Sequence, residues 1–123
     1  EYALKVLKIR NLIILGHSNC GGIEYSYKTL LDKKNINDFE YINQWVSCLQ
    51  NAYNNIPNDF SETDKITFFE QENIKQSIKS LREHDFIDKL INENKLNVIG
   101  LWYQINSGLI KFLDNNNSFI DLD

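Results

Sequence analysis

The hydrophobic positions of this chain form short continuous runs separated by stripes with helical spacing. The first run is Asn11-Leu12-Ile13-Ile14-Leu15, and the second is Val98-Ile99-Gly100-Leu101-Trp102-Tyr103. Runs of this length and composition are typical of strands buried in a parallel sheet. A third run, residues 109–113, follows the turn Asn106-Ser107-Gly108. Because asparagine and glycine accept positive φ angles, we expect the second and third runs to form a hairpin.

Between these runs, apolar residues recur at three- and four-residue steps, the period of an amphipathic helix. Residues 23–31 predict a helix that ends in a polar turn at residues 32–35. A second helix is predicted to end at Pro57, and a third to be capped by Ser61. The stripe residues, which we expect in the core, are Phe39, Ile42, Trp45, Leu49, Tyr53 and Ile56 in the second helix and Ile66, Phe69, Ile74, Ile78 and Leu81 in the third.

This order of strands and helices predicts an α/β fold, with a mostly parallel central sheet flanked by helices and an antiparallel edge strand. We expect the first strand to be central and the second to join it in parallel through a helical crossover. The strand at 109–113 would fold back at the edge. With 123 residues, 42% of them hydrophobic, the chain has enough apolar material for one core, so we expect a single domain over residues 1–123.

The loop after the first strand carries the candidate chemistry. Gly16-His17-Ser18-Asn19-Cys20-Gly21-Gly22 places an imidazole and a thiol three residues apart at the carboxyl end of a strand, where active sites of α/β sheets collect. Both groups are zinc ligands, so His17 and Cys20 are candidate metal ligands. Gly21 and Gly22 would turn backbone N–H groups toward the metal and start a helix, and Gly16 would allow a sharp exit from the strand. Without His17 and Cys20, these glycines would indicate only a strand-to-helix turn.

The first 21 residues resemble a signature of the β-class carbonic anhydrases at every position that the signature specifies. The matching residues are Glu1-Tyr2-Ala3-Leu4, Leu7, Leu12-Ile13-Ile14, Gly16-His17 and Cys20-Gly21. Later segments are similar to helices and strands of the same family, although less specifically; they are residues 41–45, 72–74, 85–87 and 96–109. A pattern with this many fixed positions rarely arises by chance.

The resemblance implies a zinc enzyme that reversibly hydrates carbon dioxide to bicarbonate and a proton and that works as a homo-oligomer, a dimer or a tetramer. Zinc would be held by His17, Cys20 and one further cysteine, with the fourth position left for water. Zinc lowers the pKa of such water to about 7, a value that belongs to a carbonic anhydrase with three histidine ligands. Because Cys20 must bind as thiolate and His17 as neutral imidazole, zinc affinity should fall at low pH.

One part of the family pattern is absent from this sequence. In the family, a Cys-x-Asp-x-Arg segment supplies the third protein ligand and an aspartate held by an arginine, and no such segment occurs here. We therefore expect these residues to be the carboxyl-terminal part of a longer protein whose amino-terminal part adds two parallel strands. Alone, they should bind zinc weakly and be inactive. Cys48 and His84 match no family motif position and are poor substitutes.

Composition excludes some partners and favours one compartment. The net charge is −4 and the 13 basic residues are scattered along the sequence, which argues against nucleic acid and anionic membrane partners. No apolar run approaches the roughly 20 residues of a membrane span. Two cysteines in a chain of this size favour a reducing compartment, and we expect the cytoplasm.

Two other functions stay open. The chain could be a catalytically incomplete remnant that folds with a partner and acts as an interaction module. It could also be a thiol redox protein built on Cys20, because the start of a helix favours the thiolate form, although no Cys-x-x-Cys pair is present. Zinc content separates the enzyme from the redox protein.

Overall fold

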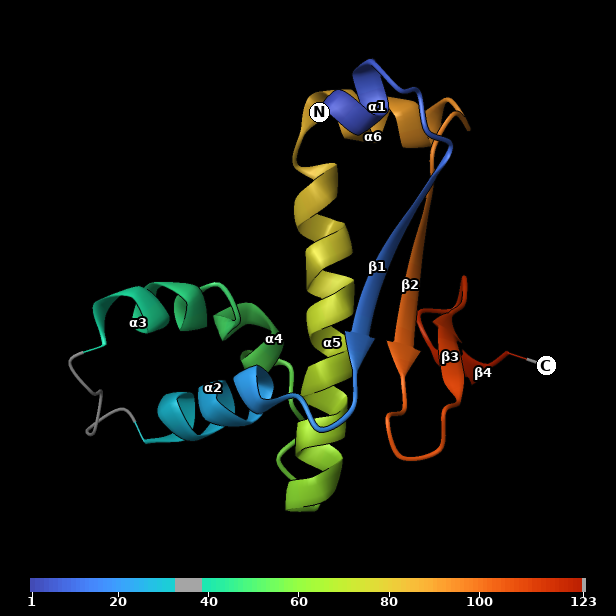
Figure 1. Ribbon diagram of the computed structural model, residues 1–123. Coiled ribbons are helices and arrows are strands. Elements are labelled where there is room, and N and C mark those ends of the chain that lie inside the picture. Colours follow the sequence, from blue (N-terminus) through green and yellow to red (C-terminus); the bar gives the residue numbers. More distant parts are fainter. Residues whose placement is uncertain (33–38, 123) are drawn as a thin grey trace.

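The computed structural model describes residues 1–32 and 39–122 (Figure 1). The predicted turn after residue 31 therefore lies largely outside the described residues. The elements in this part of the chain are α1 (Tyr2–Lys5), β1 (Asn11–His17), α2 (Gly21–Leu31), α3 (Glu40–Ser47), α4 (Gln50–Asn54), α5 (Glu62–Arg82), α6 (Asp85–Asn92), β2 (Asn97–Tyr103), β3 (Ile110–Leu113) and β4 (Phe119–Asp121). The predicted α/β class is confirmed.

The described strands form one mixed sheet in the order β1-β2-β3-β4. β1 and β2 are parallel, and their register runs from Asn11 opposite Asn97 to His17 opposite Tyr103. β2 pairs with β3, and β3 with β4, in antiparallel orientation. The predicted parallel pair and the hairpin after it are thus confirmed.

Two details of the predicted sheet are wrong. Among the described residues β1 pairs on one side only, so it is an edge strand and not a central one. At the other edge, the unpredicted β4 covers β3. The turn between β3 and β4 is built by Asp114, whose Oδ1 accepts from the N–H groups of Asn116 and Ser118, at 2.9 and 2.8 Å. A strand of three residues after an asparagine-rich loop is too short to show a hydrophobic period.

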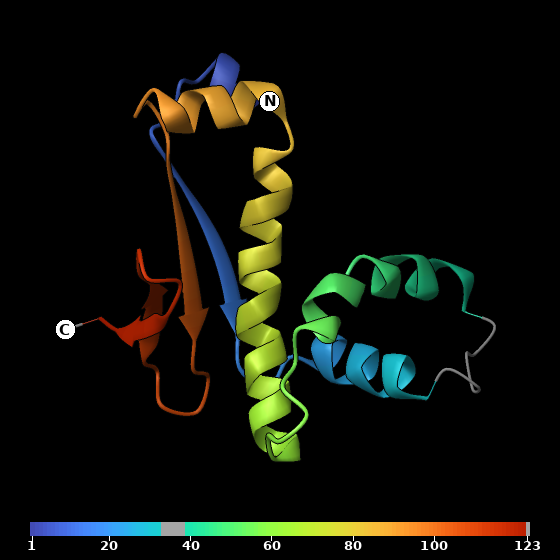
Figure 2. The same ribbon diagram turned by 180° about the vertical axis from the view of Figure 1, so that it is seen from behind.

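The long helix α5 lies along one face of β1 and β2 (Figures 1 and 2). Ser61 caps it as predicted, since its Oγ accepts from the N–H of Asp64 at 3.2 Å. Gly16 and Gly100 allow the close approach of this helix. A Cβ atom at Gly16 would lie 2.7 Å from Cδ1 of Ile74, and one at Gly100 would lie 3.1 Å from Cγ2 of the same residue. Gly16 lies inside β1, so it makes room for Ile74 and does not mark the expected exit from the strand.

The helix predicted to end at Pro57 is interrupted. The N–H groups of Cys48 and Leu49 bond to carbonyls three residues earlier, at 3.1 and 2.9 Å, and this tight turn separates α3 from α4. The later stripe residues Leu49, Tyr53 and Ile56 belong to the core or pack against it. The earlier ones do not, because α3 stands away from α5 and the sheet, as both ribbon views show. Phe39, Ile42 and Trp45 are 52%, 45% and 47% exposed, so their predicted burial is wrong.

Most of the buried apolar residues form two clusters, one near each end of α5. The first consists of Ile23, Tyr27, Leu49, Ala52 and Phe69, and Cys20 packs against it. The second consists of Leu4, Ile87 and Leu96. The first cluster therefore supports the loop that carries the candidate ligands. None of the helices in the described part of the chain is both long and apolar enough to cross a bilayer.

Ionisation of Tyr27 makes the stability of this first cluster depend on pH. Its hydroxyl donates to Oε2 of Glu62 at 3.0 Å, and burial together with the Glu62 carboxylate raises the pKa of Tyr27 to about 12. The unfolded chain ionises its tyrosines near pH 10, so stability is full below that pH and falls as the pH rises towards 12. We expect the free energy of unfolding, measured with urea at about pH 9 and about pH 11, to fall more in the wild type than in Tyr27→Phe. Equal losses in both proteins would contradict this account.

Candidate metal centre

Both predicted ligands lie in the short loop between β1 and α2. His17 is the last residue of β1, and Cys20 is the N-cap of α2, which begins at Gly21. The chain reverses at Asn19, whose φ of 55° is left-handed, a conformation that asparagine tolerates better than most residues. The sequence had predicted that the neighbouring glycines, and not Asn19, would make this turn. Gly21 and Gly22 do start the helix, as expected, and Gly22 also leaves room for the Trp45 ring, 2.8 Å from where its Cβ would lie.

The loop is tied to the turn that follows β2. The N–H of Ser18 donates to the carbonyl of Tyr103 at 2.8 Å, which extends the parallel ladder by one bond. The Ser18 hydroxyl accepts from the N–H of Ile105 at 2.9 Å. Asn19 adds a longer bond to the side chain of Asn106, at 3.4 Å. Residues far apart in the sequence thus fix where the loop leaves the sheet.

His17 presents one ring nitrogen for a metal. Its Nδ1 lies 2.9 Å from the carbonyl oxygen of Ser18. A carbonyl oxygen can only accept, so Nδ1 carries the proton and Nε2 keeps its lone pair. Metal-binding histidines commonly donate from the other nitrogen in this way, which fixes the tautomer and the ring orientation. Sequence reasoning did not assign the nitrogen, and the structure indicates Nε2.

Cys20 is also suited to bind a metal. It is a free, half-buried cysteine, and its side chain makes no capping hydrogen bond to the helix that it precedes. The Sγ atom therefore has no competing structural role at the N-cap. A metal ligand at this position would bind as the thiolate.

The described residues supply an incomplete ligand set for zinc. Imidazole nitrogen and thiolate sulfur are the donors that zinc selects, so His17 and Cys20 fit it by type and by position. No group of three or more His, Cys, Asp or Glu side chains in residues 1–32 and 39–122 could hold a metal ion. Cys48 and His84 line a separate cavity of about 430 Å³, whose lining includes no residue of the His17–Cys20 loop.

A buried carboxylate that sequence reasoning missed contacts this loop. Glu70 of α5 is 4% exposed, and its Oε1 accepts from the N–H of Cys20 at 3.1 Å. Its Oε2 accepts from the indole N–H of Trp102 in β2 at 3.3 Å. Burial raises the pKa of the Glu70 carboxyl, although these two donors and the charge of His17 lower it in part. The available signal was an acidic residue four positions from Ile66 and four from Ile74, on the apolar face of the helix.

A cavity of about 430 Å³ borders the His17–Cys20 loop. Its lining includes Ser18 and Asn19 of the loop, Glu70 and Thr67 of α5, and Trp102 of β2. Ile66 and Trp102 line it together with hydroxyl, amide and carboxyl groups. Gln104, Asn106 and Ser107 close it on the side of the turn between β2 and β3, and neither His17 nor Cys20 lines it.

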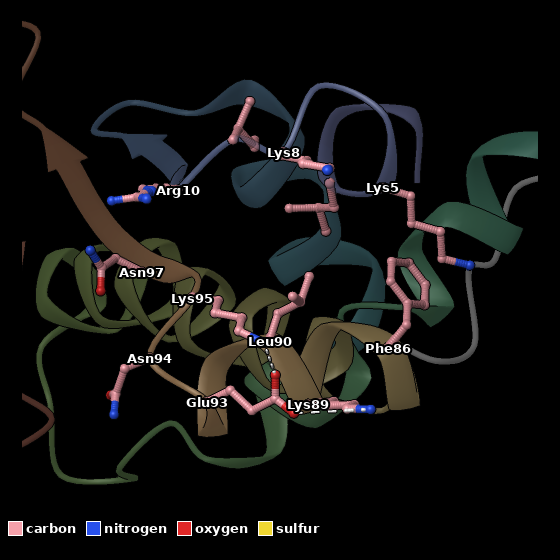
Figure 3. Close-up of a pocket in the computed structure, with 12 residues that line it drawn as sticks. Lys5, Lys8, Arg10, Phe86, Lys89, Leu90, Glu93, Asn94, Lys95 and Asn97 are labelled. Carbon is pink, nitrogen blue, oxygen red and sulfur yellow. Dashed lines mark hydrogen bonds and ion pairs between the residues drawn. The ribbon is translucent and has the colours of Figure 1, made fainter.

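A larger cavity, of about 840 Å³, lies where β1 and β2 begin, the end opposite to the candidate ligands (Figure 3). Its lining includes the basic residues Lys5, Lys8, Arg10, Lys89 and Lys95 and the single acid Glu93, which pairs with Lys89 and Lys95. Basic residues that are scattered along the sequence thus gather at this end of the molecule. These side chains come from two separate segments, residues 4–10 and 86–97, so their proximity could not be read from the sequence.

Comparison with known proteins agrees with the fold. The chain matches the carbonic anhydrase family model over residues 1–110. It is similar to β carbonic anhydrase 3 of Arabidopsis thaliana (31% identity over 111 residues) and to a carbonic anhydrase of Helicobacter pylori (29% over 116 residues). These alignments cover 88% and 89% of this chain, but 43% and 51% of the relatives.

Solved structures give the same result. The structure of the β-carbonic anhydrase CcaA matches with a TM-score of 0.85 at 23% identity, covering 100% of this chain and 56% of that one. A tetrameric β-carbonic anhydrase from Sordaria macrospora matches with a TM-score of 0.74 at 26% identity, covering 92% of this chain and 56% of that one. The fold is thus that of a carbonic anhydrase of the β class. The chain belongs to the β-carbonic anhydrase family. It spans about half the length of the curated relatives it matches.

Proposed function

We propose that these residues are part of a protein that catalyses the zinc-dependent, reversible hydration of carbon dioxide to bicarbonate and a proton. The observation that carries the proposal is the placement of His17 and Cys20 together at the carboxyl end of β1, in a chain of this family. When bound, zinc would supply the acidity that makes water a nucleophile near neutral pH.

The residues of this chain would hold and orient the metal. His17 offers Nε2 because the Ser18 carbonyl holds the proton on Nδ1. Cys20 offers a thiolate at the start of α2, where the partial positive charge of the helix favours an anion. The bonds from Ser18 to Tyr103 and Ile105 keep both ligands at the sheet edge. Bicarbonate and carbon dioxide would reach the loop through the adjoining cavity.

The third ligand and the aspartate held by an arginine would come from residues outside this sequence. Two observations support this part of the proposal. The chain covers about half of its relatives. Among the described residues β1 is unpaired at one edge, and Ile13 and Leu15 on one of its faces are 54% and 62% exposed, as expected for a sheet that further residues would extend and cover. We also propose that the protein forms a homo-oligomer, because a structural neighbour is tetrameric. A cytoplasmic location is proposed because both cysteines are free.

The isolated 123 residues should bind zinc weakly and should not hydrate carbon dioxide at an enzymatic rate, because they contain only two of the expected ligands. The test compares them with the protein of native length, whose intact mass and amino-terminal sequence are determined first. We expect stoichiometric zinc and chelator-sensitive hydration in the native protein only. Zinc-dependent hydration by the 123 residues that is lost in Cys20→Ser would contradict the expectation. If the native protein consisted of these residues alone, the interaction module would replace the enzyme.

A further inference from the structure

We infer that Glu70 is a positioning residue that holds the backbone of Cys20 in place for metal binding. The inference rests on the proposed function and adds to it a residue outside the His-x-x-Cys motif. Its carboxylate joins three elements, since it is carried by α5, accepts from the loop after β1 and accepts from Trp102 in β2.

Burying the Glu70 carboxylate costs free energy that its hydrogen bonds must offset. A buried carboxyl group is unfavourable unless its oxygens are hydrogen-bonded. Here each oxygen has its own donor, the N–H of Cys20 at 3.1 Å and the indole N–H of Trp102 at 3.3 Å. The indole N–H is buried and the N–H of Cys20 is half-buried, and both would lose a partner if the carboxylate were absent. The arrangement therefore fixes Cys20 relative to Trp102, a residue that is 3% exposed.

Packing between α5 and β1 places Glu70 next to the loop. Ile74 lies one helical turn after Glu70, on the same face of α5. The absent side chain at Gly16 leaves the space that Ile74 occupies against β1. This close approach brings the preceding turn of α5, with Glu70, to the end of β1. The spacing of Glu70 and Ile74 on the helix thus links the packing at Gly16 to the hydrogen bond at Cys20.

The bond between Glu70 and Cys20 affects how well the two candidate ligands are positioned. Ser18 fixes the loop on the side of His17 through Tyr103 and Ile105, whereas Cys20 has no capping bond from its own side chain. The bond from its N–H to Glu70 is the side-chain contact that holds its backbone. Without this bond the distance between Nε2 of His17 and Sγ of Cys20 would vary more, and the affinity for zinc would fall. Loss of such outer partners commonly costs about 10- to 100-fold in metal affinity.

The test uses the protein of native length and the Glu70→Gln variant. Glutamine has one oxygen that accepts and one amide nitrogen that only donates, so it can satisfy Cys20 or Trp102 but not both. We expect the zinc dissociation constant, measured by competition with a chromogenic chelator, to rise about 10- to 100-fold. The thiolate-to-metal charge-transfer band of the cobalt-substituted protein should change in intensity, because the geometry at Sγ changes.

Glu72 provides a matched control. It is also a buried carboxylate of α5, 8% exposed, but it accepts from Asn55 at 2.8 Å and from Gln76 at 3.2 Å, and no bond joins it to the loop in the described residues. Glu72→Gln should lower the free energy of unfolding without changing zinc affinity or the cobalt spectrum. Equal losses of zinc affinity in both variants would overturn the inference, because they would show a general effect of a destabilised α5.

The Trp102→Phe variant serves as a second background, in which the loss of a hydrogen bond by Glu70→Gln can be distinguished from the loss of charge. Once Trp102→Phe removes the indole donor, a single acceptor is enough for Cys20. The change from Glu70 to glutamine should then cost less than about threefold in zinc affinity. An undiminished loss in this background would indicate an effect of charge and overturn the inference. If the wild type binds zinc through His17 and Cys20 but Glu70→Gln binds it equally well, only this inference fails. If the wild type binds no zinc, the proposed function fails with it.

Discussion

Replacing Cys20 by serine is expected to remove zinc and carbon dioxide hydration from the protein of native length. Serine has nearly the same size, but its hydroxyl is a poor zinc ligand at neutral pH, whereas a thiolate is a strong one. Since loss of an outer partner already costs about 10- to 100-fold in metal affinity, we expect loss of this ligand to cost more than about 100-fold. Zinc content after dialysis and stopped-flow hydration rates measure the two effects.

Cys48→Ser is the control for this variant. Cys48 is the other cysteine of the chain, it is exposed, and its Sγ lies 3.6 Å from the carbonyl of Gln44 at the end of α3. Zinc content and activity should be unchanged in this variant. If Cys20→Ser retained full zinc and full activity, Cys20 would not be a ligand.

Replacing Phe69 by alanine is expected to have the largest effect on stability. Phe69 has no exposed surface, lies on α5 and contacts the ring of Tyr53 edge-on, with 6.0 Å between the ring centres. Truncation of a buried phenylalanine leaves a cavity and commonly costs about 3–5 kcal/mol. We expect a loss of this size in the free energy of unfolding, measured with urea on the protein of native length.

The effect of Phe69→Ala should also reach the metal loop, since Cys20 packs against the same cluster. Phe60→Ala is the control, because Phe60 is 38% exposed and its removal should cost less than about 1 kcal/mol. A loss at Phe69 no greater than the loss at Phe60 would show that the first cluster does not hold this half of the chain together.

The sequence predicted most of the elements that position the site because their signals are local. The apolar run at residues 11–15, the Ser61 cap and the turn around Gly108 each specify an element through their own residues. The His17–Cys20 loop could be found in the same way, because its position after a strand and before a helix follows from neighbouring residues.

The missed features depend on contacts between distant segments. Whether Phe39, Ile42 and Trp45 are buried depends on what covers α3, and a helical stripe alone cannot show this. β4 is only three residues long and depends on pairing with β3. The position of Glu70 on the apolar face of α5 can be read from the sequence, but its partners in β2 and in the loop cannot. The nitrogen of His17 follows from one hydrogen bond to the next residue.

The most direct test of the account is anomalous diffraction at the zinc edge from crystals of the native-length protein. The account predicts one zinc ion per chain at the end of β1, bonded to Nε2 of His17 and to Sγ of Cys20, with the sulfur at about 2.3 Å. Zinc bonded to other side chains, or no zinc in protein that hydrates carbon dioxide, would contradict it.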